Sequence, residues 1–75
     1  MRLFRSAAVR ELDGIIEDMK INLANNYKEP AHRSRERLGA RCEELYAAGK
    51  LKEADYRHYK AEYEKYTLML KDYHH

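Results

Sequence analysis

The sequence contains few of the residues that cross-link or interrupt a small fold. Its 75 residues include one cysteine, one proline, three glycines and no tryptophan. Because Cys42 has no second cysteine to pair with, a disulfide within the chain is excluded. A core of this size typically supplies only about 3–5 kcal/mol of net stability without other support. We therefore expect one small domain, spanning 1–75, that is stabilised partly by self-association.

Two β-branched residue types are scarce as well. Val9 is the only valine and Thr67 the only threonine, whereas Ala, Leu, Glu, Lys and Arg are common. This composition favours helices over strands throughout the chain. No uncharged run approaches the roughly 20 residues that a bilayer span requires.

The first residues, MRLFRSAAVREL, lack the apolar core of a secretory signal. Charges at Arg5, Arg10 and Glu11 interrupt the apolar residues. Together with the single cysteine, this pattern predicts a reducing, cytoplasmic location. The formal net charge of +2 argues against a dedicated polyanion binder, whose domains usually carry a clear basic excess.

Apolar residues at steps of three and four predict three helices, at about residues 6–27, 30–48 and 52–73. The sequence is therefore typical of an all-α fold, a small antiparallel three-helix bundle. The expected inward residues of the first helix are Ala8, Leu12, Ile15, Ile16, Met19, Leu23 and Tyr27. Those of the second helix are Ala31, Leu38, Cys42 and Leu45.

The segment NNYKEP predicts the first break. Paired asparagines suit a helix end, because asparagine tolerates left-handed backbone conformations. Pro30 suits the first turn of a new helix, and Glu29 before it is expected to be non-helical. A single long helix that is kinked at Pro30 is the alternative interpretation.

The segment ELYAAGKLKEADY predicts the second break. Gly49 falls where a helix should end in a left-handed residue, and Leu51 can pack back on that end in a Schellman motif. So short a link predicts that the last two helices form a tight antiparallel hairpin.

Tyrosines line the third predicted helix at heptad spacing. The row consists of Tyr56, Tyr59, Tyr63, Tyr66, Leu70 and Tyr73. We interpret it as the inner seam of the bundle, with Tyr56 and Tyr73 as its more exposed ends. The other interpretation is a protein-binding surface, since tyrosine is enriched at interfaces. A second stripe, Ala54, Ala61 and Leu68, recurs every seven residues on the far side and is also a candidate interface.

Basic residues gather in the second helix. Arg33, Arg37 and Arg41 lie four apart, with Arg35 nearby. A row of this kind can follow a phosphate backbone. The same helix also carries acidic residues, which favour an ordinary solvated face with ion pairs such as Glu29 with Arg33.

Histidine and cysteine spacing predicts no metal site and no cofactor. The four histidines, His32, His58, His74 and His75, do not form the pairs of a helical zinc site. His74 and His75 are either native or the remnant of a tag. Cys42 falls on the inward row, where most cysteines act as small buried hydrophobic groups.

The strings NNYK, ELYAAGKL and DYRHYKAEYEKY, with the closing YHH, resemble small helical proteins carried by bacterial conjugative and other mobile elements. The resemblance covers most of the chain from Asn25 onward. It implies a bacterial, cytoplasmic origin and an accessory role. It implies no activity and no functional residues.

These features predict a non-catalytic helical protein that acts through protein–protein interaction. Apolar stripes on more than one face carry this expectation, and self-association is part of it. The alternative is an accessory protein that binds nucleic acid through Arg33, Arg35, Arg37 and Arg41.

Overall fold

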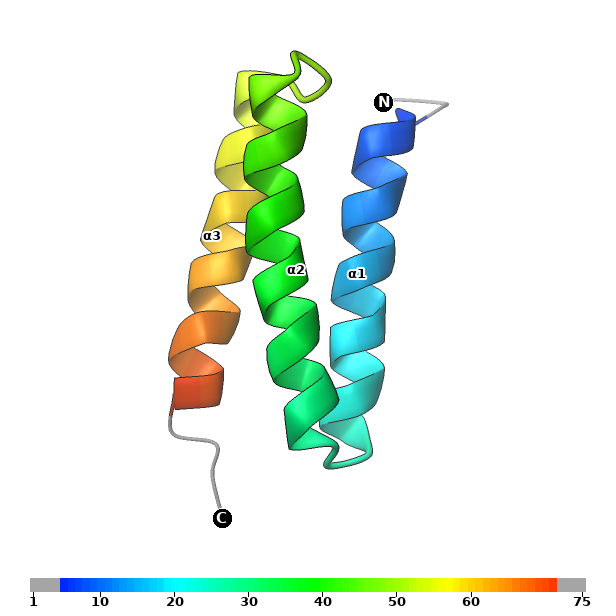
Figure 1. The fold of residues 1–75 in the computed structure, drawn as a ribbon, viewed down its shortest axis with the longest axis vertical. Helices are drawn as coiled ribbons and strands as arrows, with labels where there is room; N and C mark the ends of the chain where they lie inside the picture. The colour runs from blue at the N-terminus through cyan, green and yellow to red at the C-terminus, as the bar shows by residue number, and fades with distance from the viewer. Residues whose placement is uncertain (1–4, 72–75) are drawn as a thin grey trace.

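The computed structural model describes residues 5–71, which form three helices joined by two short links. Helix α1 spans Ala7–Ala24, α2 spans Lys28–Ala47 and α3 spans Glu53–Lys71 (Figure 1). The described residues include no strand, which confirms the predicted all-α class.

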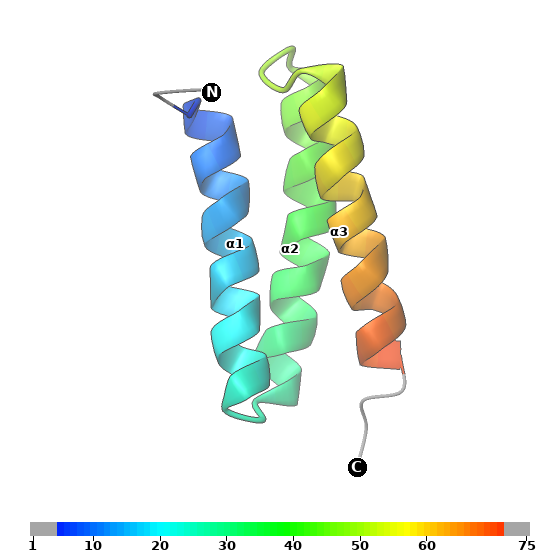
Figure 2. The same ribbon diagram turned by 180° about the vertical axis from the view of Figure 1, so that it is seen from behind.

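Helix α2 is the central element of the bundle. It packs against both α1 and α3, which flank it and contact each other least. In both views the three helices run down, up and down in chain order (Figures 1 and 2). The predicted antiparallel bundle is therefore confirmed, with α1 and α3 parallel to each other and antiparallel to α2.

A Schellman motif closes α1. The N–H of Tyr27 donates to the carbonyl of Asn22 at 2.8 Å, and that of Asn26 donates to Leu23 at 3.1 Å. Asn26 adopts the left-handed conformation, with φ of 65°. Asparagine is one of the few residues that tolerates this geometry, so the NNYKEP segment breaks the helix rather than kinking it.

Two expectations for this link were wrong. Helix α1 ends at Ala24, so Tyr27 lies outside it and is exposed rather than inward. Glu29 is helical, because α2 already begins at Lys28. Pro30 therefore occupies the third helical position, where the missing N–H has no intrahelical partner to lose. The steric bias against a helical residue before proline is a preference, which the rest of this first turn overrides.

The second link confirms the predicted Schellman motif. Gly49 has φ of 73°, its N–H donates to Tyr46 at 3.0 Å, and the N–H of Lys50 donates to Leu45 at 2.9 Å. Leu51 is buried against the end of the hairpin. This link turns the chain back within a few residues and sets α3 alongside α2.

The core lies where the three helices face one another. The predicted inward row of α2 is fully confirmed, and that of α1 is confirmed up to Met19, with Leu23 partly buried. Val9 is an additional core residue. The buried residues are Ala8, Val9, Leu12, Ile15, Ile16, Met19, Ala31, Leu38, Cys42, Leu45, Leu51, Tyr59, Tyr66 and Leu70.

Candidate protein interface

The tyrosine row divides into two depths. Tyr59 and Tyr66 are buried, whereas Tyr56 and Tyr63 are half-buried and pack against the core from the α2 side. The interpretation of the row as an inner seam is therefore confirmed for the residues of the row that lie within 5–71. Tyr73, the other predicted exposed end, lies outside the described residues.

Tyr59 connects α3 to α1. Its hydroxyl donates to the carboxylate of Asp13, which also pairs with Arg5. Burial, followed by the bond to Asp13, raises the pKa of Tyr59. The ring of His58 meets the Tyr59 ring edge-on at 4.7 Å. The phenol is thus held neutral as a structural donor.

Tyr56 is engaged within the α2–α3 hairpin. Its ring stacks on Tyr46 with 3.9 Å between centroids, and its hydroxyl donates to Glu43 at 2.9 Å. Lys60 pairs with the same carboxylate at 2.8 Å. Hydrogen bonds from Lys60 and Tyr56 lower the pKa of Glu43. This predicted interface residue therefore already has partners in its own chain.

Tyr63 lies directly over Gly39 of α2. A Cβ at Gly39 would be 2.6 Å from a ring carbon of Tyr63. Arg35 and Lys60 flank the same ring, at 5.8 Å and 5.5 Å from its centroid. The role of Gly39 in this contact was not predicted from the sequence. A glycine inside a helix does not indicate which side chain of another helix will pack on it.

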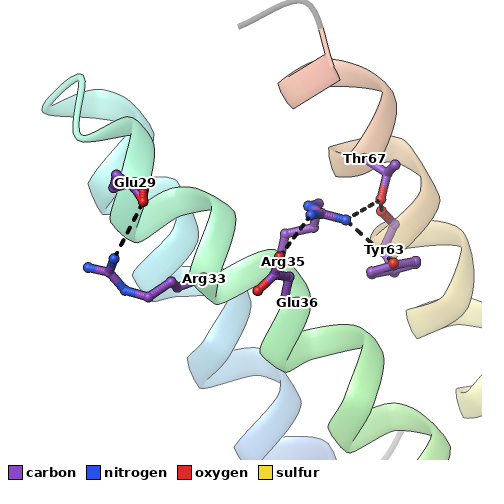
Figure 3. Close-up of polar contacts among 6 residues, drawn as sticks. All are labelled: Glu29, Arg33, Arg35, Glu36, Tyr63 and Thr67. Carbon is purple, nitrogen blue, oxygen red and sulfur yellow. Dashed lines mark hydrogen bonds and ion pairs between the residues drawn. The ribbon is translucent and has the colours of Figure 1, made fainter. Parts of the chain in front are cut away.

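The basic row of α2 does not form one surface. Arg33 faces solvent and pairs with Glu29 at 3.9 Å, which confirms that predicted pair (Figure 3). Arg35 turns toward α3 instead, where it reaches the hydroxyls of Tyr63 and Thr67 at 3.4 and 3.5 Å (Figure 3). Its side chain is only 17% exposed.

Arg41 turns to the opposite side, toward α1. It binds both carboxylate oxygens of Glu11 and donates to Glu44 at 2.7 Å. The hydrogen bonds from Arg41 to Glu11 lower the pKa of Glu11. Arg37 remains exposed and lines an open groove with Arg33. The other residues of that groove are Asp18, Ile21, Asn22, Pro30 and Ser34.

The outer stripe, which consists of Ala54, Ala61 and Leu68, lies uncovered on α3. Leu68 is 67% exposed, the largest exposure among the large hydrophobic residues of the described chain. No helix of residues 5–71 packs on this side, because the core-facing residues of α3 are Tyr59, Tyr66 and Leu70. Met69 beside the stripe is also half exposed.

Cys42 is fully buried beneath α3, and burial raises the pKa of its thiol. Within residues 5–71, no three His, Cys, Asp or Glu side chains are grouped to hold a metal ion. None of the described helices has the length and apolarity to cross a membrane. His74 and His75 lie outside the described residues.

Comparison of the chain with protein-family models, with curated proteins and with solved structures finds no match.

Proposed function

We propose that this is a non-catalytic protein that acts by binding another protein through the outer stripe of α3. The exposure of Leu68, in line with Ala54 and Ala61, carries the proposal. Covering a leucine side chain stabilises a complex by about 1.5–3 kcal/mol. Small alanines beside it allow a partner's backbone to approach closely.

We further propose a cytoplasmic location, and the state of the one cysteine supports a non-catalytic role. A nucleophilic cysteine is usually accessible and has a depressed pKa. Cys42 is buried, and its pKa is raised. The resemblance to small proteins of bacterial mobile elements adds the expectation of an accessory role.

Nucleic-acid binding through the basic row receives less support. Two of its four arginines, Arg35 and Arg41, are occupied by contacts to α3 and α1. Only Arg33 and Arg37 remain to meet phosphates. Binding of this kind predicts an affinity for DNA or RNA that falls steeply with salt. The absence of DNA or RNA binding at low salt would exclude this alternative.

Affinity capture with three versions of the protein tests the proposal. The variant Leu68→Glu places a charge in the stripe, and Ile21→Glu places the same charge at an exposed aliphatic residue of α1. We expect a partner that wild type and Ile21→Glu retain and that Leu68→Glu loses by about tenfold or more. Equal capture by all three versions, each shown to be helical by circular dichroism, would contradict a role for this face.

A further inference from the structure

We infer that the outer stripe of α3 binds the same stripe of a second copy of this chain, with the two helices antiparallel across a two-fold axis at Ala61. The inference rests on the proposed function, because it names the partner of that face. Three properties of the face carry it: the symmetry of its apolar residues, the order of its charges and its exposure.

The apolar residues are symmetric about Ala61. Ala54 and Leu68 each lie seven residues away, so all three share one side of the helix. A two-fold axis at Ala61 sets Ala54 of each copy opposite Leu68 of the other. A small side chain then faces a large one at both ends, which is how closely packed layers interdigitate. The two Ala61 residues meet at the centre, where small side chains let the helices approach.

The charges along one edge of the stripe have a matching order. Glu53, Arg57, Glu64 and Lys71 follow one another at steps of four, seven and seven, and all four are exposed. Their charges alternate along the helix: negative, positive, negative and positive. With the axis at Ala61, an antiparallel copy reverses the order, which brings Glu53 within two residues of the level of Lys71 and Arg57 within one residue of the level of Glu64 of the second copy.

This order also selects the orientation of the pair. In a parallel pairing this edge would meet the other edge of the second copy, where Arg57 would lie beside His58 and, of the four charges, Glu64 alone would lie beside an opposite charge. In the antiparallel pairing all four positions meet an opposite charge. Charged residues that flank an apolar seam set orientation in paired helices generally. The other edge carries His58 and Lys65, with Asp55 and Glu62 beside them, and Lys65 pairs with Glu62 of its own chain at 3.3 Å.

The charged edge is available for such contacts. Among residues 5–71 its one ion pair is that of Arg57 with Glu53 at 2.6 Å, and the two side chains are 77% and 62% exposed. A guanidinium has five N–H donors, so Arg57 can keep Glu53 and bind Glu64 of the second copy. Glu64 faces solvent on α3.

The size of the face predicts a reversible dimer. Helix α3 has 19 residues and is therefore about 28 Å long. One helix pair of this length is smaller than the standard interface of about 1,600 Å². We expect the molar mass in solution to rise above the 9.0 kDa of the single chain as the protein concentration increases through the micromolar range.

Engineered cysteines test the geometry. Under mild oxidation, Ala61→Cys should form a disulfide-linked dimer at least about tenfold faster than Ala40→Cys, because bridging requires Cβ atoms about 4 Å apart. Ala40 is an exposed alanine on α2, and Cys42, which every variant retains, is buried. A mixture of Ala54→Cys and Leu68→Cys should cross-link one variant to the other. Cross-linking of Ala54→Cys mainly to itself would overturn the antiparallel arrangement.

Charge reversal tests whether the charged edges of the two copies contact each other. Arg57→Glu and Glu64→Arg should each weaken the dimer about tenfold or more in sedimentation, and the double variant should restore it, because opposite charges again face each other. A wild-type chain that stays at 9.0 kDa up to about millimolar concentration, or Ala61→Cys that reacts no faster than Ala40→Cys, would overturn the inference.

The two proposals fail separately. If the chain is monomeric but Leu68→Glu loses a different captured protein, the inference is wrong and the proposed function stands. If Leu68→Glu affects neither self-association nor capture, both are wrong.

Discussion

At the scale of single residues, the α2–α3 contact depends on a glycine. Gly39 leaves room for the ring of Tyr63, which lies between Arg35 and Lys60. Gly14 in α1 is different, since a Cβ there would meet nothing within 4 Å. The two helical glycines therefore have opposite roles: Gly14 is tolerated, and Gly39 is required by its neighbour.

This contrast predicts opposite effects of alanine at the two positions. Gly14→Ala should raise the free energy of unfolding by about 1 kcal/mol through helix propensity. Gly39→Ala should lower it, because displacing the Tyr63 ring costs about 1–3 kcal/mol and exceeds the same gain. Urea denaturation of the two variants measures both. An equal gain at Gly39 would mean that the ring moves without cost.

At the scale of elements, both links end a helix with the same backbone motif but with different residues. Each helix end has a left-handed residue, Asn26 after α1 and Gly49 after α2, followed by the paired hydrogen bonds of a Schellman motif. The link after α2 is the one that forms the hairpin. Its geometry therefore determines whether the tyrosines of α3 reach the core.

Substitution of Gly49 should measure the cost of this geometry. Gly49→Ala places a Cβ in a left-handed conformation, which costs about 1–2 kcal/mol. Gly49→Asn should cost less, because asparagine already fills the equivalent position at Asn26. Thermal and urea unfolding of the two variants tests the order. Equal losses would show that the tolerance of asparagine for left-handed conformations gives no advantage at this position.

At the scale of the whole molecule, pairs between helices connect α2 to each flanking helix. Arg41 binds Glu11 of α1, and Glu43 accepts hydrogen bonds from Lys60 and Tyr56 of α3. These contacts lower the pKa of both carboxyl groups. Both sides of the bundle are therefore expected to weaken when carboxylates are protonated.

Acid should destabilise the protein, with a sign that follows from these shifts. A carboxyl group with a lowered folded-state pKa contributes stability above its ordinary value of 4.5 and loses it as the pH falls through the folded-state value. Glu11→Gln should reduce stability at pH 7 and reduce the further loss on acidification to about pH 3. Chemical denaturation at the two pH values measures this difference.

The matched control for Glu11→Gln is Glu17→Gln. Glu17 is exposed on α1 and has no ion pair with another described residue. This substitution should leave the stability at both pH values nearly unchanged. An acid dependence in Glu11→Gln that equals that of wild type would assign the acid loss to other carboxyl groups.

The candidate interface was predictable in part. The stripe of Ala54, Ala61 and Leu68 follows from a spacing of seven, and the structure leaves it uncovered. Tyr56 follows from the same kind of spacing but is half-buried, because Tyr46 and Glu43 of α2 lie within its reach. Periodicity gives the side of a helix on which a residue lies. It does not give the neighbour that meets it there.

The sequence by itself determined the number of helices, the two breaks and the inward rows, because these depend on local conformational preferences and on the period of one helix. Asn26, Gly49 and the inward row of α2 are examples. Only the tertiary structure decided that Arg35 turns to α3 and Arg41 to α1, and that Gly39 lies beneath Tyr63. Those outcomes depend on how side chains of different helices pack together, which no single helix encodes.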